Sequence, residues 1–256
     1  MVTNSNWVTG PAHDPAEAWN IDLIRTVTNP MKETMSYLLH IDSTAFAAEA
    51  FSRQVAQSFR DEWAGPVVYR DLALTPAPHI TAAGITARLT DPADHTPEQT
   101  EALAIQDELI DEFLGASAYL FTVPMYNYTM PSVFKAWIDQ VVVVGRTIAL
   151  PDGPPAAGRP AVVVSARGGS YEPGVPNHGM DHVFTTLETS IGPKSLGLLI
   201  HPIKPELTLA PVVPQMAALV DLHTASLSDS HLEARRLALH LGAGRTRTAA
   251  LVNTDR

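Results

Sequence analysis

The segment Pro124–Pro131 carries the side chains best suited to binding a small aromatic ligand. Prolines at both ends restrict its backbone. Between them lie a thioether, two phenol rings and an amide, on Met125, Tyr126, Asn127 and Tyr128. These groups suit a flat, conjugated heterocycle with a polar edge. A flavin is such a ligand.

A second turn offers hydroxyl groups. Ser43 and Thr44 follow the apolar run Tyr37–Ile41, and Ser52 lies eight residues beyond Thr44. Hydroxyls beside the backbone amides of a helix start can form a phosphate cradle. Serine or threonine at such a place also caps helices without binding any ligand, and on this segment alone both interpretations stay open.

A third turn follows the apolar run 160–165. Its two glycines allow a backbone to approach a ligand closely, so that several amides can face the edge of a ring. The alternative is an ordinary turn after a strand. The residues of this turn are Ala166, Arg167, Gly168 and Gly169.

The elements that must position these turns alternate between strand and helix. Apolar runs predict strands over 37–41, 66–69, 118–123, 160–165 and 196–201. Apolar periodicity predicts helices over 46–63, 96–114, 132–144, 181–191 and 214–241, the last with a candidate break near 226–230. This pattern predicts an α/β fold: a flavodoxin-like, five-stranded parallel sheet in the order 2-1-3-4-5, with helices on both faces.

Two segments stand outside this alternation. Residues 1–34 are rich in Asn, Thr, Pro and Asp, and we expect a disordered leader or a misassigned start, with one flavodoxin-like domain over 35–256. The alternative is a short arm that packs on the fold or on a dimer partner. Residues 73–95 predict no element, and a loop of this length is usually functional or mobile.

Composition argues against several classes of function. The net charge of -10 disfavours a nucleic-acid surface, which needs clustered Lys and Arg. The absence of cysteine removes disulfides and thiolate nucleophiles, so redox chemistry would need a bound organic cofactor. The histidines show no metal-binding spacing, and we assign no metal. Without an apolar stretch of about 18 residues or a secretory signal, we expect no membrane span and a cytoplasmic location.

Taken together, the motifs resemble the family of FMN-dependent NADH azoreductases and NADH:quinone oxidoreductases. The resemblance runs from Met35 to roughly Leu209 and rests on five segments: His40–Thr44, Tyr69–Leu72, Pro76–Pro78, Pro124–Tyr128 and Ala166–Gly169. It implies a homodimer with FMN at each of two interface sites. The family's FMN-binding residues fall on Thr44, Ser52, Met125, Tyr126, Asn127, Tyr128, Ala166, Arg167, Gly168 and Gly169, with alanine replacing serine at 50 and 166.

The resemblance also implies the chemistry. NADH would pass a hydride to flavin N5, and a quinone or azo compound would then be reduced at the same site, with no catalytic side chain. The preference for NADH comes from the family alone. Three alternatives stay open: a flavodoxin-like electron carrier, an FMN-binding regulator without turnover, and an FMN reductase that releases reduced flavin.

Overall fold

The computed structural model describes residues 37–45 and 49–252, with side chains described up to residue 242. The predicted leader over 1–34 lies outside the described residues. No helix in the described part of the chain is both long and apolar enough to cross a membrane.

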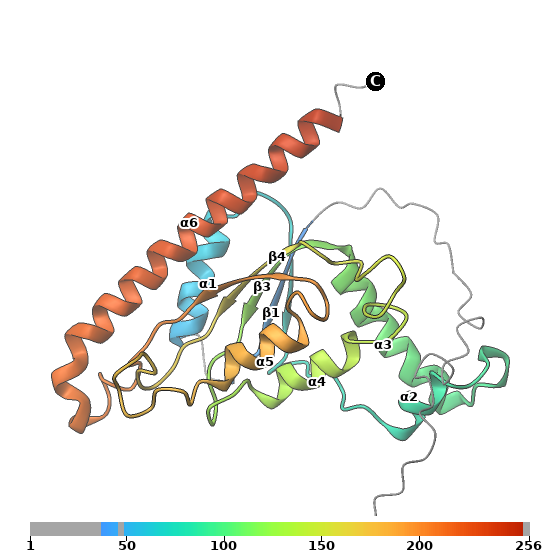
Figure 1. The fold of residues 1–256 in the computed structure, drawn as a ribbon, viewed down its shortest axis with the longest axis horizontal. Helices are drawn as coiled ribbons and strands as arrows, with labels where there is room; N and C mark the ends of the chain where they lie inside the picture. Colours follow the sequence, from blue (N-terminus) through green and yellow to red (C-terminus); the bar gives the residue numbers. More distant parts are fainter. Residues whose placement is uncertain (1–36, 46–48, 253–256) are drawn as a thin grey trace, which may run out of the picture. The chain divides into compact units, whose positions relative to one another are not determined.

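The sheet has the predicted topology. Five parallel strands pair in the order β2-β1-β3-β4-β5, which confirms the flavodoxin-like arrangement (Figure 1). In the register of the sheet, Asp42 lies opposite both Asp71 and Thr122, and Thr122 lies opposite Val164. The strands are β1 (Tyr37–Asp42), β2 (Val67–Asp71), β3 (Ala116–Thr122), β4 (Pro160–Val164) and β5 (Leu199–Ile203).

Helices cover both faces of the sheet, because each interior strand is apolar on both sides. In β1, Leu38 packs in a core with α1 and α6, whereas Leu39 and Ile41 point to the opposite core with α3, α4 and α5 (Figure 1). The helices are α1 (Phe51–Glu62), α2 (Ala82–Ala87), α3 (Pro97–Gly115), α4 (Ser132–Val141), α5 (His182–Ser190) and α6 (Val220–Val252), with short 3-10 turns η2 (Pro92–Asp94) and η3 (Pro214–Leu219).

Two predictions about the helices were wrong. The helix expected from residue 46 begins at Phe51, because Ala50 has an extended backbone with ψ of 128°; residues 46–48 lie outside the described part. The candidate break near 226–230 is absent, and α6 continues through it. Ser226 and Ser230 do not interrupt the helix, because Ser230 donates to the Ser226 carbonyl at 2.7 Å and the Ser226 hydroxyl accepts from the Glu206 amide at 3.0 Å.

Two further predictions need correction. The segment 73–95 contains α2 and η2, and α2 begins at a Thr81 cap whose hydroxyl accepts from the Gly84 amide at 3.1 Å. Strand β5 begins at Leu199, three residues later than expected. The delay follows from Gly197, which adopts φ of 79° in a turn where a Cβ would lie 2.7 Å from Ala157 Cα.

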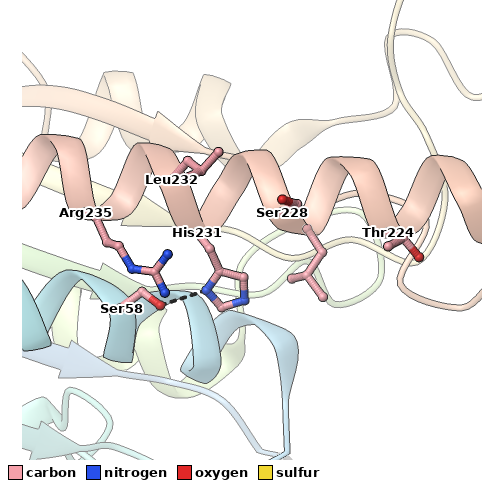
Figure 2. A pocket seen from close by; sticks show the side chains of 7 residues that line it. Ser58, Thr224, Ser228, His231, Leu232 and Arg235 are labelled. Atoms are coloured by element: carbon pink, nitrogen blue, oxygen red, sulfur yellow. Dashed lines mark hydrogen bonds between the residues drawn. The ribbon is translucent and has the colours of Figure 1, made fainter.

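Helices α1 and α6 meet along a seam that contains polar groups. Ser58 Oγ and His231 Nδ1 lie 2.8 Å apart, and the side chain of Arg235 extends beside them (Figure 2). A shallow groove of about 430 Å³ opens along this seam. It contains none of the residues that the sequence assigns to ligand binding, so the candidate site lies elsewhere.

Beneath the sheet edge, His40 is a buried histidine on β1, with 2% of its surface exposed. Its Nε2 lies 2.8 Å from Thr122 Oγ1, and its ring contacts Tyr69 edge to face. Burial lowers the pKa of His40 well below its usual value, and the charges of Arg60 and Arg53 add to the effect. The folded protein therefore holds this imidazole neutral.

We predict that the pH dependence of stability changes when His40 is replaced by glutamine. Because the folded-state pKa lies below the unfolded value, the unfolded chain takes up a proton first as the pH falls below about 6.5. Native stability should then decrease by up to about 1.4 kcal/mol per pH unit, and His40→Gln should lose this contribution. Urea unfolding from pH 7 to pH 5 measures the difference. Equal slopes in both proteins would contradict the assignment.

Candidate active site

The three predicted turns meet at the carboxyl edge of the sheet. The Ala45 amide donates to the hydroxyl of Tyr126 at 3.1 Å, which joins the turn after β1 to the turn after β3. The Met125 amide donates to the Ala166 carbonyl at 2.9 Å, which joins the turn after β3 to the turn after β4. The structure therefore brings together segments that are far apart in the sequence: the first contact joins residues 81 positions apart. In open α/β sheets this edge is where ligands bind.

The start of α1 has the properties of an anion cradle. Thr44 and Ser52 are each 1% exposed, and their hydroxyl oxygens lie 3.2 Å apart. Ala50 is the N-cap residue, so no side chain caps the first-turn amides, and that turn contains no acidic residue. The capping interpretation of Ser43 and Thr44 was therefore wrong. Uncapped amides beside two buried hydroxyls favour a bound anion.

A cluster of charges stabilises this turn. Arg53 donates from Nε to Asp42 at 2.6 Å and from Nη2 to Asp71 at 2.7 Å and to the Thr44 carbonyl at 3.1 Å. Asp42 in turn accepts from the Thr44 amide at 2.9 Å. Tyr69 donates to Asp42 at 3.1 Å, and burial together with the two carboxylates raises the pKa of this phenol.

None of these charged residues was among the predicted site residues. The sequence did contain a signal. An acidic residue comes just after each of the first two predicted strands, Asp42 and Asp71, and Arg53 lies early in the helix between those strands. Only the pairing of β1 with β2 places Asp42 opposite Asp71. The predicted strand order already made β1 and β2 neighbours, but the sequence does not specify their register, so the cluster emerges only from the fold.

The turn after β3 is a tight reversal. The amides of Tyr126 and Thr129 donate to each other's carbonyls at 2.8 and 3.1 Å, and Asn127 and Tyr128 between them have φ of 49° and 69°. A tyrosine in this left-handed region is uncommon, and such strain clusters at ligand sites. The Tyr128 carbonyl is held by the His182 amide at 3.0 Å, while its side chain is exposed. An exposed ring in a fixed backbone can stack on a planar ligand.

The remaining predicted residues divide by role. Met125 packs on the core beside the site. The guanidinium of Arg167 is directed into the protein, with 1% of its side chain exposed, and pairs with Asp181 at 2.5 Å between the rings of Tyr171 and Phe184. Arg167 therefore supports its turn through its side chain, and the side chain does not point to a ligand.

The glycines of this turn are constrained on one side. The carbonyls of Gly168 and Gly169 accept from the amides of Leu209 and Leu207 at 3.3 and 3.1 Å. A Cβ at Gly168 would lie 2.7 Å from Leu209 Cδ1. The amides of both glycines have no hydrogen-bond partner among the described residues, so they remain available to a ligand. The residues that the structure describes contain no group of three or more His, Asp or Glu that could hold a metal ion.

Comparison with known proteins agrees with this geometry. Residues 36–192 match the model of a family described by its flavodoxin-like fold. The FMN-dependent NADH:quinone oxidoreductase of Streptomyces coelicolor is 46% identical over 206 residues, covering 78% of this chain and 92% of the relative. Its namesake from Frankia alni is 41% identical over 213 residues, covering 80% and 100%. The chain belongs to the FMN-dependent NADH:quinone oxidoreductase family.

A solved structure shows the same fold as this family member. An azoreductase from Bacillus anthracis superposes with a TM-score of 0.68 at 22% identity, covering 80% of this chain and 100% of the azoreductase. At this identity the likeness shows the fold alone. The family membership expected from the motifs is confirmed, and the roles of individual residues stay predictions.

The ion pair beneath the third turn can be tested by Asp181→Asn. Asn keeps the oxygen that accepts from the Val183 amide at 3.1 Å, but it places an amide donor against the buried guanidinium. We expect a loss of about 2–4 kcal/mol in the free energy of unfolding, because one charge is left buried and unpaired. Chemical denaturation measures it.

A matched control is Asp139→Asn, which breaks the exposed pair of Lys135 and Asp139 on α4. That pair, between residues four apart on one helix, should contribute less than about 1 kcal/mol. Equal losses in the two variants would show that the Arg167 pair is no more important than a surface contact.

Proposed function

We propose that this protein is an FMN-dependent NADH:quinone oxidoreductase that also reduces azo compounds. The observation that carries the proposal is what lies together at one sheet edge: a helix start whose N-cap makes no side-chain cap, two buried hydroxyls, an exposed aromatic turn, and two glycine amides with no partner among the described residues. The names of the relatives support the same activity.

The residues at this edge fit FMN. The phosphate would be held by the hydroxyls of Thr44 and Ser52 and by the first amides of α1, rather than by a cationic side chain. The flavin ring would lie against the turn Met125, Tyr126, Asn127 and Tyr128, with the backbone of Ala166, Arg167, Gly168 and Gly169 at its polar edge. Alanine at 166 removes a hydroxyl, but its carbonyl already accepts from Met125, so the turn keeps its shape.

When bound, FMN supplies the hydride-accepting and hydride-donating centre, with NADH as donor and a quinone or azo compound as acceptor. The protein's own contribution is binding and orientation. Tyr126 fixes the turn after β1 through the Ala45 amide, and the left-handed backbone at Tyr128 presents its ring outward. We assign no side chain as an acid or base.

The alternatives differ in what they require of the chain. A small electron carrier does not account for the match over 92% of the length of a relative named as an oxidoreductase. A regulator without turnover would not exchange electrons with NADH, and an FMN reductase would release its flavin. The cytoplasmic location, and residues 35–256 as a single FMN-binding domain, stay predictions.

The central test is a spectrum of the purified protein under anaerobic conditions. We expect flavin absorbance that bleaches on addition of NADH and returns with benzoquinone, while the flavin stays with the protein on gel filtration. A colourless protein that remains inert after added FMN would refute the proposal. Bleaching followed by loss of the flavin would favour an FMN reductase instead.

We also propose that the protein is a homodimer. Apolar side chains remain exposed on α2, on the turn after it and on α3, and these two helices pack on each other: Ile85, Leu89 and Ile105. Leu89 is 71% exposed, and a contiguous group of exposed apolar side chains is typical of a surface that another protein covers. A second copy of the chain is the partner that the family resemblance implies.

For the dimer we predict that Leu89→Glu yields a species of 27.6 kDa, whereas the unaltered chain has twice that mass. A buried glutamate would oppose association, and the exposed position should leave folding intact. Light scattering coupled to gel filtration gives the masses. Leu232→Glu on α6, at a position 59% exposed, is the control and should stay dimeric. A monomeric unaltered chain would exclude the dimer.

A further inference from the structure

Two carboxylates converge on one guanidinium beside the proposed phosphate cradle. Asp42 and Asp71 both bind Arg53, at 2.6 and 2.7 Å, and both accept from the Tyr69 hydroxyl, at 3.1 and 3.3 Å. Asp42 is buried, and its second oxygen accepts from the Thr44 amide. The acidic cluster is therefore hydrogen-bonded to the backbone of Thr44, whose hydroxyl helps to form the proposed phosphate cradle.

The charges of this cluster do not cancel. Asp42 and Asp71 contribute two negative charges and Arg53 one positive charge, so the cluster carries one net negative charge. Tyr69 is neutral, because burial and the two carboxylates raise the pKa of its hydroxyl. Glu49 is exposed, and the Arg60 guanidinium lies 5.1 Å from the centre of the Tyr69 ring without an ion pair to either carboxylate among the described residues.

A net negative cluster lowers the binding affinity most for a ligand that carries a phosphate, because the two negative charges repel each other. Two charges about 8 Å apart interact by about 2 kcal/mol at an effective dielectric constant of 20. FMN carries a phosphate close to two negative charges at pH 8, whereas riboflavin has the same ring and no phosphate. Any electrostatic effect of the cluster should therefore appear with FMN and be absent with riboflavin.

We propose that the balance of Asp42, Asp71 and Arg53 sets how strongly the site prefers FMN to riboflavin, with Arg53 as a positioning residue that offsets the two carboxylates. The inference rests on the proposed FMN site. Arg53 also contacts the Thr44 carbonyl, so a role limited to shaping the turn is the rival explanation. The two explanations differ in the effect of removing a carboxylate.

The test is a series of three variants of the full-length chain: Arg53→Met, Asp71→Asn and the double variant. Their clusters carry net charges of −2, 0 and −1, so the double variant matches the unaltered chain. In the unaltered chain, the amides of Ala73 and Leu74 donate to Asp71 Oδ1 at 2.9 and 3.3 Å. Asp71→Asn keeps an oxygen that can accept these two hydrogen bonds. Circular dichroism establishes that each variant is folded.

Dissociation constants for FMN and riboflavin at pH 8 and low salt come from flavin fluorescence. We expect Arg53→Met to weaken FMN binding roughly 10- to 100-fold, Asp71→Asn to strengthen it roughly 3- to 30-fold, and the double variant to lie near the unaltered chain. Riboflavin affinity should change by less than about 3-fold throughout, and the FMN differences should shrink in high salt.

Other outcomes overturn the inference. If FMN and riboflavin affinities fall together in Arg53→Met, the arginine only shapes the turn. If Asp71→Asn weakens FMN binding or leaves it unchanged, the charge balance is irrelevant, and this variant decides the question even where Arg53→Met fails to fold. If the unaltered chain binds neither flavin, the proposed function itself fails, which is a different result.

Discussion

The site depends on the register with which β1, β3 and β4 pair. Asp42, Thr122 and Val164 lie side by side in the sheet, so all three strands end at the same level. The ladder continues one residue further, with the Ser43 amide donating to Thr122 at 3.0 Å and the Val123 amide to Val164 at 2.9 Å. A shift of one residue in any pair would turn every side chain of that strand to the other face.

The polar groups that fix the three turns also determine which backbone donors remain for a ligand. Each turn that leaves the sheet is fixed by a polar group that is itself buried or partly buried: Arg53 for the first, Tyr126 for the second and Arg167 for the third. Among the described residues, these anchors leave the amides of Gly168 and Gly169 without a hydrogen-bond partner, and the N-cap of α1 makes no side-chain cap. Rigid backbone with unpaired donors is what a preorganised binding site requires.

The sequence was sufficient for the order of the sheet and for the three turns that meet at its carboxyl edge. Near-continuous apolar runs predicted the strands, and the predicted helix over 96–114 has a capping box at Thr96 and Gln99 that marks the start of α3. The sequence was insufficient where the answer depends on neighbours in space. The side chain of Arg167 is buried because it pairs with Asp181, fourteen residues later, which the sequence did not predict. The helix α6 continues past its serines because Glu206 is beside them.

A crystal structure of the protein grown with FMN tests most directly where the cofactor is held. We predict that the phosphate lies at the start of α1, within hydrogen-bonding distance of the hydroxyls of Thr44 and Ser52 and of the first helical amides. A phosphate bound elsewhere, or a flavin absent from the carboxyl edge of the sheet, would contradict it.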